Sequence, residues 1–452
     1  MGGLTVALNT ALSGLFAHQQ AIAATSENIA NVNSADFSRR EANFFTDAIP
    51  NQFAGVSVEI ARAGSNRFLQ SAGFAAQADA GALNAIADAL ANVEASLGAP
   101  GDNLDFANAL NEAYASFAQL SAAPNSIAAR AVAIADLDAA FNAFSRTLDA
   151  IDSEVSASDA RIETQTARAN ALLENIFILN QIVSDEGGAG DAIDAAVREL
   201  STLLNISVSR ADDGRVTVAT ADGQVLAGPG GFSALSFAGG VSGQIALANV
   251  DPETGVVSSA QTDITAVVTA GEIGGLVQVR NSELPVLRAA VANAAQLTAD
   301  DINNAYALNA SVGATGPATT PLIVVANGGF SVNASIAADP AQLAIARPTA
   351  GQPGGANDGS GAGAIAALGD APSAGTAADA VTQIGAASQI AGERRAAAEV
   401  FANDLETRRL SESGVNLDEE LSNLILFQRA YNANARVIAA VDELYQTVLN
   451  IL

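Results

Sequence analysis

The sequence of 452 residues predicts a mainly α-helical, rod-shaped protein with a β insertion, organised as nested domains. Three observations predict this fold class. Apolar residues repeat at helical spacing near both ends of the chain, and the same repeat runs through a long segment without proline or glycine. A stretch after residue 205 alternates apolar and polar residues instead, which is typical of β-strands. We therefore expect terminal coiled-coil helices, a long helical bundle and a small β domain.

The N-terminal segment predicts an amphipathic helix, which Gly2-Gly3 precede and residues 31–34 end. Its apolar face follows the 4-3-4-3 spacing of a coiled-coil seam. The seam positions are Leu4, Leu8, Ala11, Leu15, His18, Ile22, Thr25 and Ile29.

The C-terminal segment predicts a second helix of the same kind. Asn416 is its expected N-cap, with Glu419 three residues later as in a capping box, and the acidic residues 418–420 suit the positive end of the helix dipole. The seam positions are Leu424, Phe427, Tyr431, Asn434, Ile438, Val441, Tyr445, Val448 and Leu452.

An isolated amphipathic helix is marginal in water, so each seam needs a partner. We expect the two seams to pack against neighbouring subunits; pairing of the two helices within one chain is the alternative. The predicted interface residues are Leu4, Leu8, Leu15, Ile22, Ile29, Leu424, Phe427, Tyr431, Ile438, Val441, Tyr445, Val448 and Leu452.

The longest predicted helix lies between the two ends. Heptad spacing holds from Leu137 to Val183, and a continuous helix from Ile127 to Val183 would be about 85 Å long. Shorter helices are expected at Gly81–Ser96 and Leu104–Ser121, with a break at Gly98–Pro100 between them.

The β domain is predicted from Asn205 to Thr269. Alternating runs at 206–208 and 216–220 are joined by a turn at Asp213-Gly214, and Asp222-Gly223 turns the chain again. Further short strands are expected at Gln244–Leu247, Val256–Val257 and Ile264–Val268.

Helical spacing resumes at Ser282–Leu308. The segment Gly351–Gly375 is rich in small residues and is predicted to be a loop, and a last helix at Ala377–Leu410 leads to the C-terminal seam. The predicted domains are 1–40 with 411–452 for assembly, 41–204 with 270–410 for the helical rod, and 205–269 for the β-rich outer part.

Composition excludes most catalytic chemistry. The chain has no cysteine and no lysine, and its single histidine is His18, so thiol nucleophiles, Schiff bases and multi-histidine metal sites are excluded. A hydrolase with two carboxylates is the enzyme class left open. The formal charge of −28 disfavours nucleic acid and anionic membranes as partners.

The N-terminus lacks the features of a cleaved secretory signal, because Met1 to Ser26 holds no basic residue. No apolar run reaches the roughly 18 residues of a membrane span. If the protein leaves the cytoplasm, it uses another route.

Four motifs imitate functional sites without meeting their requirements. His18 occupies a seam position and is expected to be a polar packing residue that sets register. Gly359–Ala364 imitates a dinucleotide fingerprint, but no strand precedes it, so a loop is expected. Asp212–Gly214 and Asp251–Gly255 lack the alternating ligands of a calcium loop and are expected to be turns. No catalytic, cofactor or metal site is predicted.

Residues Ser26–Arg40, which read SENIANVNSADFSRR, resemble the N-terminal signature of flagellar axial proteins, with Asp36-Phe37 where the family has Gly-Tyr. Four further stretches resemble the hook-associated protein 1 (FlgK) family, and the chain is identified as a member of it. These stretches are Gly55–Arg62 with 67–69, Leu120–Ser126 with 129–130, Gly271–Arg280, and Ser413–Glu420 with 427–428 and 430–431.

This resemblance implies a structural protein at the hook–filament junction of the bacterial flagellum. It implies export through the flagellar type III apparatus to an extracellular site, and head-to-tail polymerisation of identical subunits into a ring. The implied partners are the hook protein below, the second junction protein above, and a cytosolic export chaperone on the C-terminal helix over Leu424–Leu452. Two alternatives stay open: another axial protein (second junction, hook or rod), or a glycan-binding or enzymatic module in residues 205–269.

Overall fold

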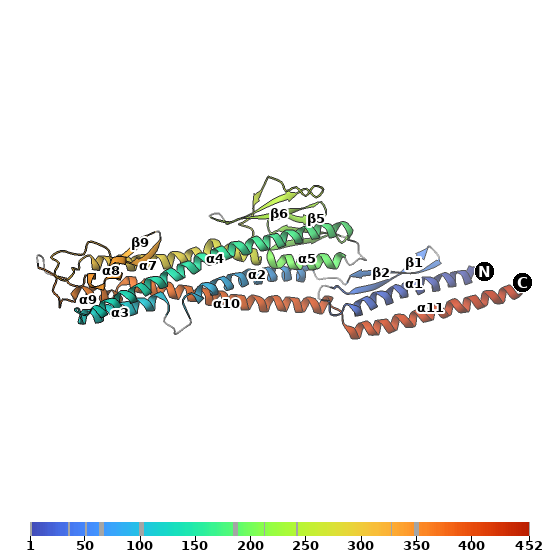
Figure 1. The fold of residues 1–452 in the computed structure, drawn as a ribbon. Coiled ribbons are helices and arrows are strands. Elements are labelled where there is room, and N and C mark those ends of the chain that lie inside the picture. Colours follow the sequence, from blue (N-terminus) through green and yellow to red (C-terminus); the bar gives the residue numbers. More distant parts are fainter. Residues whose placement is uncertain are drawn as a thin grey trace.

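The computed structural model describes residues 2–34, 37–49, 52–62, 67–98, 104–183, 189–211, 213–240, 243–326, 328–347 and 352–451. This part of the chain forms an elongated rod, and the two termini lie together at one end (Figure 1). The predicted mainly helical class with a β insertion is confirmed.

At the terminal end, α1 (Gly2–Ala30) and α11 (Leu417–Ile451) lie side by side (Figure 1). An antiparallel hairpin of β1 (Arg40–Ile49) and β2 (Gln52–Arg62) packs on α1. We call α1, α11 and this hairpin the terminal arm.

The hairpin lies at the start of the segment 41–204, which the sequence assigns to the helical rod without predicting an element for these residues. Its inward residues, such as Val58 and Ile60, are half-buried, whereas the alternating residues Ser57 and Glu59 are exposed. A two-stranded ribbon is marginal in water, so the hairpin depends on its contact with α1. That tertiary contact is the reason why helical spacing alone missed it.

The rod is a bundle of long helices: α2 (Arg67–Ala95), α3 (Phe106–Ala122), α4 (Ile127–Ile182), α7 (Leu284–Tyr306) and α10 (Pro372–Ser413). The 56-residue α4 confirms the long helix predicted from heptad spacing. The largest side chains that the rod buries are aromatic: Phe106, Phe117, Phe141, Phe144 and Tyr306.

The helix predicted to start at Gly81 begins earlier, because Gly81 serves close packing within α2. A Cβ atom there would lie 2.4 Å from the carbonyl oxygen of Thr202 in α5 (Ala189–Leu203), a helix that the sequence did not predict. A Cβ on Gly275 of α6 (Gly271–Gln278) would lie 2.3 Å from the carbonyl oxygen of Ala82. Glycine therefore lets α2, α5 and α6 approach each other.

The inserted sheet has six antiparallel strands in chain order. They are β3 (Ile206–Arg210), β4 (Val216–Thr220), β5 (Val225–Gly228), β6 (Gly231–Ala238), β7 (Gln244–Val250) and β8 (Thr262–Asp263). β5 and β6 were not predicted. The predicted strand at Ile264–Val268 is wrong, because this segment turns so that Ile264 and Val268 enter the core, and Val256–Val257 contributes only an isolated bridge from Val257 to Val250.

The sheet shares a core with α4. The rings of Phe177 on α4 and Phe232 on β6 lie 5.6 Å apart, and Leu173 belongs to the same cluster as Val218 of the sheet. The π-helical segment η1 (Val279–Glu283) joins α6 to α7. From η1, the guanidinium of Arg280 donates to the Asp159 carboxylate on α4 and to the carbonyl of Gly240, which follows β6.

The far end of the rod carries a small cap of short elements. They are β9 (Ile323–Ala326), β10 (Gly329–Val332), α8 (Ala334–Ala338), η2 (Pro340–Gln342), α9 (Ser360–Ala366) and η3 (Ala367–Asp370). The loop predicted at Gly351–Gly375 is therefore wrong in its second half, which is helical. Only glycine fits at positions 359 and 361 in this segment, because a Cβ at Gly359 would overlap the carbonyl oxygen of Ser121 and a Cβ at Gly361 that of Ile345.

We expect Gly275→Ala to lower the free energy of unfolding by roughly 1–3 kcal/mol, because the added methyl overlaps backbone of α2. Gly73→Ala in α2, where nothing lies within 4 Å of the added Cβ, should raise it by about 0.5–1 kcal/mol. Urea unfolding followed by circular dichroism measures both; equal stability of the two variants would contradict the close contact.

Candidate functional site

The terminal arm holds the predicted interface residues, and α1 pairs with α11 within the chain. On α1 the buried apolar residues are Ala11, Ala17, Ala21 and Ala24; Ala11 occupies a predicted seam position, whereas the other three lie beside the seam rather than on it. Where α1 and α11 contact each other, a Cβ on Gly14 of α1 would lie 2.8 Å from the side chain of Asn434 on α11, and the hydroxyls of Thr5 and Tyr445 are 2.9 Å apart. Val441 is buried, and the side chain of Val448 and all of Leu452 lie outside the described residues. The half-buried seam residues are Leu4, Leu8, Leu15, Ile22, Ile29, Leu424, Phe427, Tyr431, Ile438 and Tyr445.

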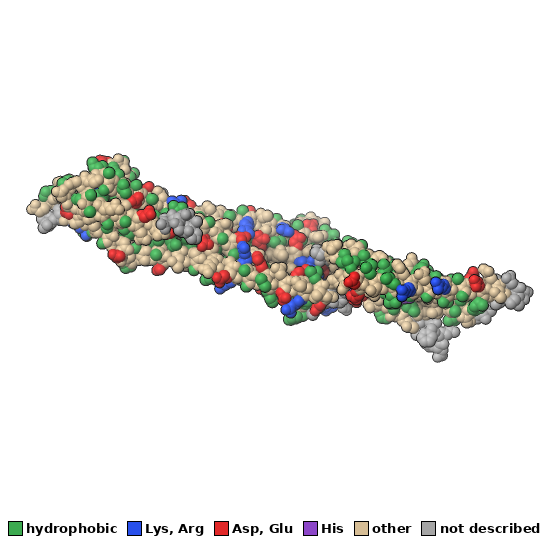
Figure 2. Space-filling view, turned by 90° about the horizontal axis from the view of Figure 1, so that it is seen from below, with side chains coloured by type: hydrophobic (Ala, Val, Ile, Leu, Met, Phe, Trp, Pro, Cys, Tyr) green, Lys and Arg blue, Asp and Glu red, His purple; other side chains and the backbone are tan. Residues whose placement is uncertain are grey.

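The outer surface of the terminal arm keeps a set of large apolar side chains in solvent. Figure 2 shows hydrophobic side chains along the arm, with basic ones among them. Their exposed fractions range from 38% for Val6 to 59% for Leu426. The exposed set is Val6, Leu12, Phe16, Phe45, Leu417, Leu421, Ile425, Leu426, Val437 and Leu444.

His18 is a packing residue, as its seam position predicts. Its ring centroid lies 5.1 Å from that of Phe44 on β1 and 6.3 Å from that of Phe427 on α11. Its Nδ1 atom is buried without a hydrogen-bond partner. Burial lowers the pKa of His18 below its ordinary value of 6.5, so the neutral ring is favoured in the folded arm.

Asn28, near the end of α1, connects the three parts of the terminal arm. Its side-chain amide donates to the carbonyl of Arg40 at 2.8 Å and to Glu420 at 3.0 Å. Its oxygen accepts the backbone N–H of Arg40 at 2.8 Å. One buried side chain thus holds α1, the first residue of β1 and the first turn of α11 together.

Arg39 completes this contact from the other side. Its guanidinium lies 2.7 Å from Glu420 and 2.9 Å from Glu419. Asn416 caps α11 as predicted, accepting the N–H of Asp418 at 3.1 Å, whereas the expected capping-box residue Glu419 binds Arg39. The acidic first turn of α11 therefore serves as the docking point of the segment that precedes β1.

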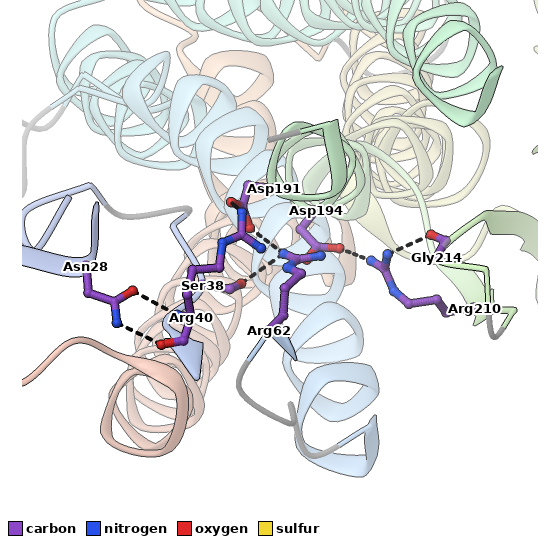
Figure 3. Close-up of polar contacts among 8 residues, drawn as sticks. All are labelled: Asn28, Ser38, Arg40, Arg62, Asp191, Asp194, Arg210 and Gly214. Carbon is purple, nitrogen blue, oxygen red and sulfur yellow. Dashed lines mark hydrogen bonds and ion pairs between the residues drawn. The ribbon is translucent and has the colours of Figure 1, made fainter. Parts of the chain in front are cut away.

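Two aspartates of α5 connect the arm to the rod and the sheet (Figure 3). Asp191 binds Arg40 at 2.8 Å and Arg62 at 2.5 Å, and Asp194 binds Arg62 at 2.6 Å and also Arg210 of β3. We call these ion pairs, together with those of Arg39, the joint.

The joint is half-buried, with the side chain of Arg40 only 4% exposed. Arginines and carboxylates alternate in it: removal of Asp191 leaves Arg40 without its carboxylate partner, and removal of Asp194 does the same to Arg210, while Arg62 loses one of its two partners. Loss of a charge partner is costly in a desolvated site. The arrangement can transmit force between arm, rod and sheet.

The same asparagine contact recurs where strands meet helices of the rod. Each amide donates to the carbonyl and accepts the N–H of one strand residue, at 2.7–2.8 Å. The pairs are Asn170 with Leu235, Asn180 with Val216, and Asn303 with Ile323. Sequence patterns did not single these residues out; a lone polar residue on an apolar helix face is the signal that could have found them.

The motifs that imitate functional sites have structural explanations. Gly359 packs on Ser121, and the Asp251 carboxylate accepts the N–H groups of Glu253 and Thr254 in a turn. In the turn at 213–215, the Asp213 carboxylate accepts the N–H of Arg215. Asp212 lies outside the described residues. Among the described residues, no group of three or more potential metal ligands occurs, and no helix is long and apolar enough to cross a membrane.

Comparisons with known proteins point to one family. The family described as flagellar hook-associated protein FlgK helical domain matches residues 90–319, just over half of the chain. The C-terminal family of the flagellar basal body rod proteins FlgEFG matches residues 406–451, and the flagella basal body rod protein family matches residues 8–37. The match to residues 8–37 covers most of α1, and the match to residues 406–451 covers the end of α10 and all of α11.

Two individual proteins are similar to the chain. Flagellar hook-associated protein 1 of Bacillus subtilis (strain 168) is 26% identical over 98% of this chain and 97% of its own length. The solved structure of the flagellar hook junction protein FlgK from Burkholderia pseudomallei is 19% identical with a TM-score of 0.50. That alignment covers 57% of this chain and 47% of the other, so it supports the fold alone.

We expect Asn28→Ala to loosen the terminal arm, because it removes three buried hydrogen bonds, each loss costing about 1–3 kcal/mol. Hydrogen exchange should speed up in α1, α11 and the hairpin but remain unchanged in the middle of α4. Asn303→Ala, which removes the same contact at the far end of the rod, is the control and should leave the arm protected. Loss of arm protection in both variants would show a global effect instead.

We expect the terminal arm to lose stability in acid because of His18. Its pKa is lowered in the folded arm, so the unfolded chain takes up the proton first as the pH falls. The contribution of the neutral His18 to the stability of the arm is therefore fully present above pH 6.5 and is lost as the pH drops through the lowered pKa of the folded arm. His18→Phe should abolish this part of the pH dependence, measured as hydrogen exchange of α1 across this range. An unchanged pH profile in the variant would contradict the assignment.

Proposed function

The chain belongs to the flagellar hook-associated protein FlgK family, and from this premise we propose that it links the hook of the bacterial flagellum to the filament. It is a structural component of the flagellum. In the proposed assembly, identical subunits form a ring through contacts between their terminal arms, with the hook protein below and the second junction protein above. Contacts between different faces of identical subunits close into a ring or continue as a helix.

The observation that carries this proposal is the exposed apolar surface of the terminal arm. The inner sides of α1 and α11 pack against each other within the chain, yet Phe16 on α1 is 55% exposed and Ile425 on α11 is 51% exposed. Contiguous apolar surface of this kind marks an interaction site. We therefore propose that neighbouring subunits contact this outer surface, rather than the seam that spacing alone suggested.

A junction between a bending hook and a stiff filament needs subunits that keep their shape under load. Two features support this role: α4 runs through the rod as one helix of 56 residues, and the joint ties the arm to α5 and β3. We propose the domain division at residues 40, 204, 269 and 410 with one change: the hairpin, which packs on α1, belongs to the terminal arm as the assembling part.

Export through the flagellar type III apparatus to the extracellular flagellum is also part of the proposal. An unfolded chain exposes the seam of α11, and a cytosolic export chaperone that covers Leu424–Leu452 would prevent premature assembly. In the folded arm α1 occupies that surface, so the chaperone and α1 would compete for it.

We propose that the protein has no enzymatic role. Both aromatic residues of the β insertion, Phe232 and Phe237, pack against the core, so neither offers a platform for sugar stacking. The match to the FlgK helical domain disfavours the alternatives of a hook or rod protein.

A charged side chain introduced on the outer surface of the arm tests whether this surface serves assembly. Ile425→Asp should leave the chain folded, because this side chain is 51% exposed, but should abolish incorporation at hook tips. Ile178→Asp on α4 is the matched control, since Ile178 is also 51% exposed but lies outside the arm. Immunolabelling of hooks measures incorporation, and flagellin released into the medium measures the missing junction.

Normal filaments in the Ile425→Asp strain would contradict the proposed assembly surface. Normal filaments in a strain that lacks the whole gene would contradict the junction role itself.

A further inference from the structure

Two arginines on α11 have no partner in the part of the chain that the structure describes. Arg429 and Arg436 are exposed, and no hydrogen bond or ion pair engages either one. Unpaired arginines are conspicuous in a chain with a formal charge of −28. They therefore suggest an acidic partner outside the subunit.

Both arginines lie on the side of α11 that faces away from the rest of the arm. Phe427 marks the inner side, because its ring is 5.8 Å from that of Phe44 on the hairpin. At 100° per residue, Arg429 and Arg436 lie roughly 200° and 180° around the helix from Phe427. Ile425, at roughly 160°, lies on this same outer side.

The outer side of the hairpin carries the opposite charge. Side chains alternate along a strand, so Glu41, Phe45 and Glu59 lie on the side opposite to Phe44 and Val58, which face the helices. Glu41 and Glu59 are exposed, and neither engages an arginine of its own chain among the described residues.

The spacing of the two charged pairs is compatible. Glu41 pairs with Ala61, so Glu59 is its diagonal neighbour across the hairpin, at about 7–8 Å between backbones. Arg429 and Arg436 are seven residues apart, or about 10.5 Å along the helix. Flexible arginine side chains readily span the difference. Each pair is flanked by an exposed apolar residue, Phe45 on the hairpin and Ile425 on α11.

We propose that the outer side of the hairpin of one subunit docks on the outer side of α11 of a second copy of this chain. Glu41 and Glu59 pair with Arg429 and Arg436, and Phe45 packs near Ile425. The two surfaces lie on opposite sides of the same arm, so a subunit cannot satisfy both by itself. The contact is heterologous, as a ring of identical subunits requires, and in this respect the inference rests on the proposed function.

A charge-swap experiment tests the contact in the flagellated bacterium. Arg429→Glu and Glu59→Arg, each alone, should reduce incorporation at hook tips at least about tenfold, because like charges then meet across the interface. The combined variant restores opposite charges between neighbours and should recover incorporation. A double variant that is as defective as either single variant would overturn the pairing.

Cross-linking gives a second, independent readout. Because the chain has no cysteine, Glu59→Cys combined with Arg429→Cys introduces the sole thiols, and oxidation of isolated hooks should yield a ladder of disulfide-linked multimers. Ser156→Cys with Arg429→Cys, which places one thiol on the exposed side of α4, is the control and should yield no ladder. Absence of a ladder from the first pair, in hooks that label normally for the protein, would overturn the contact while leaving the junction role intact. Hooks that carry no label even with the wild-type chain would instead contradict the proposed function.

Discussion

The arrangement of the terminal arm depends on the hydrogen bonds of Asn28. This residue uses both polar groups of its side chain on Arg40 and reaches Glu420, so a shift of the hairpin or of α11 by one residue would leave buried polar groups unpaired. The strand that starts here then decides the rest of the joint. Because successive side chains point in opposite directions, Arg39 reaches the first turn of α11 while Arg40 reaches Asp191 on α5.

The same contact explains how sheets are oriented on this helical rod. An asparagine amide offers one donor and one acceptor at about the spacing of a peptide group, so it can take the place of a neighbouring strand. Asn170 and Asn180 on α4 do this for the large sheet, and Asn303 on α7 does it for the small one. Apolar contacts such as Phe177 with Phe232 hold the sheet close to α4, whereas these directional bonds define which strand residue lies over which turn.

Pairing of α1 with α11 within the chain changes which surface can serve assembly. Once α1 and α11 cover each other, the remaining exposed apolar groups lie on the outer sides of α1, α11 and the hairpin, and the unpaired charges of the proposed contact lie on α11 and the hairpin. The outer side of α11 and the outer side of the hairpin face in opposite directions. This arrangement suits a subunit that contacts one neighbour through α11 and another through the hairpin. The joint then connects this assembling arm to α5 and, through Arg210, to the sheet, so the orientation of the whole rod follows the arm.

The sequence by itself determined the long helices, because heptad spacing over many turns is a local signal that requires no knowledge of the partner: α4 and both terminal helices begin and end close to their predicted residues. It also identified the family through the stretches around Asn28, Gly271 and Glu420, although not why these residues occur there. Only the tertiary structure decided that Gly81 and Gly275 allow close packing, that 40–62 forms a hairpin, and that α1 and α11 pair within one chain. These outcomes depend on contacts between residues up to several hundred positions apart, and no local pattern encodes which surfaces will meet.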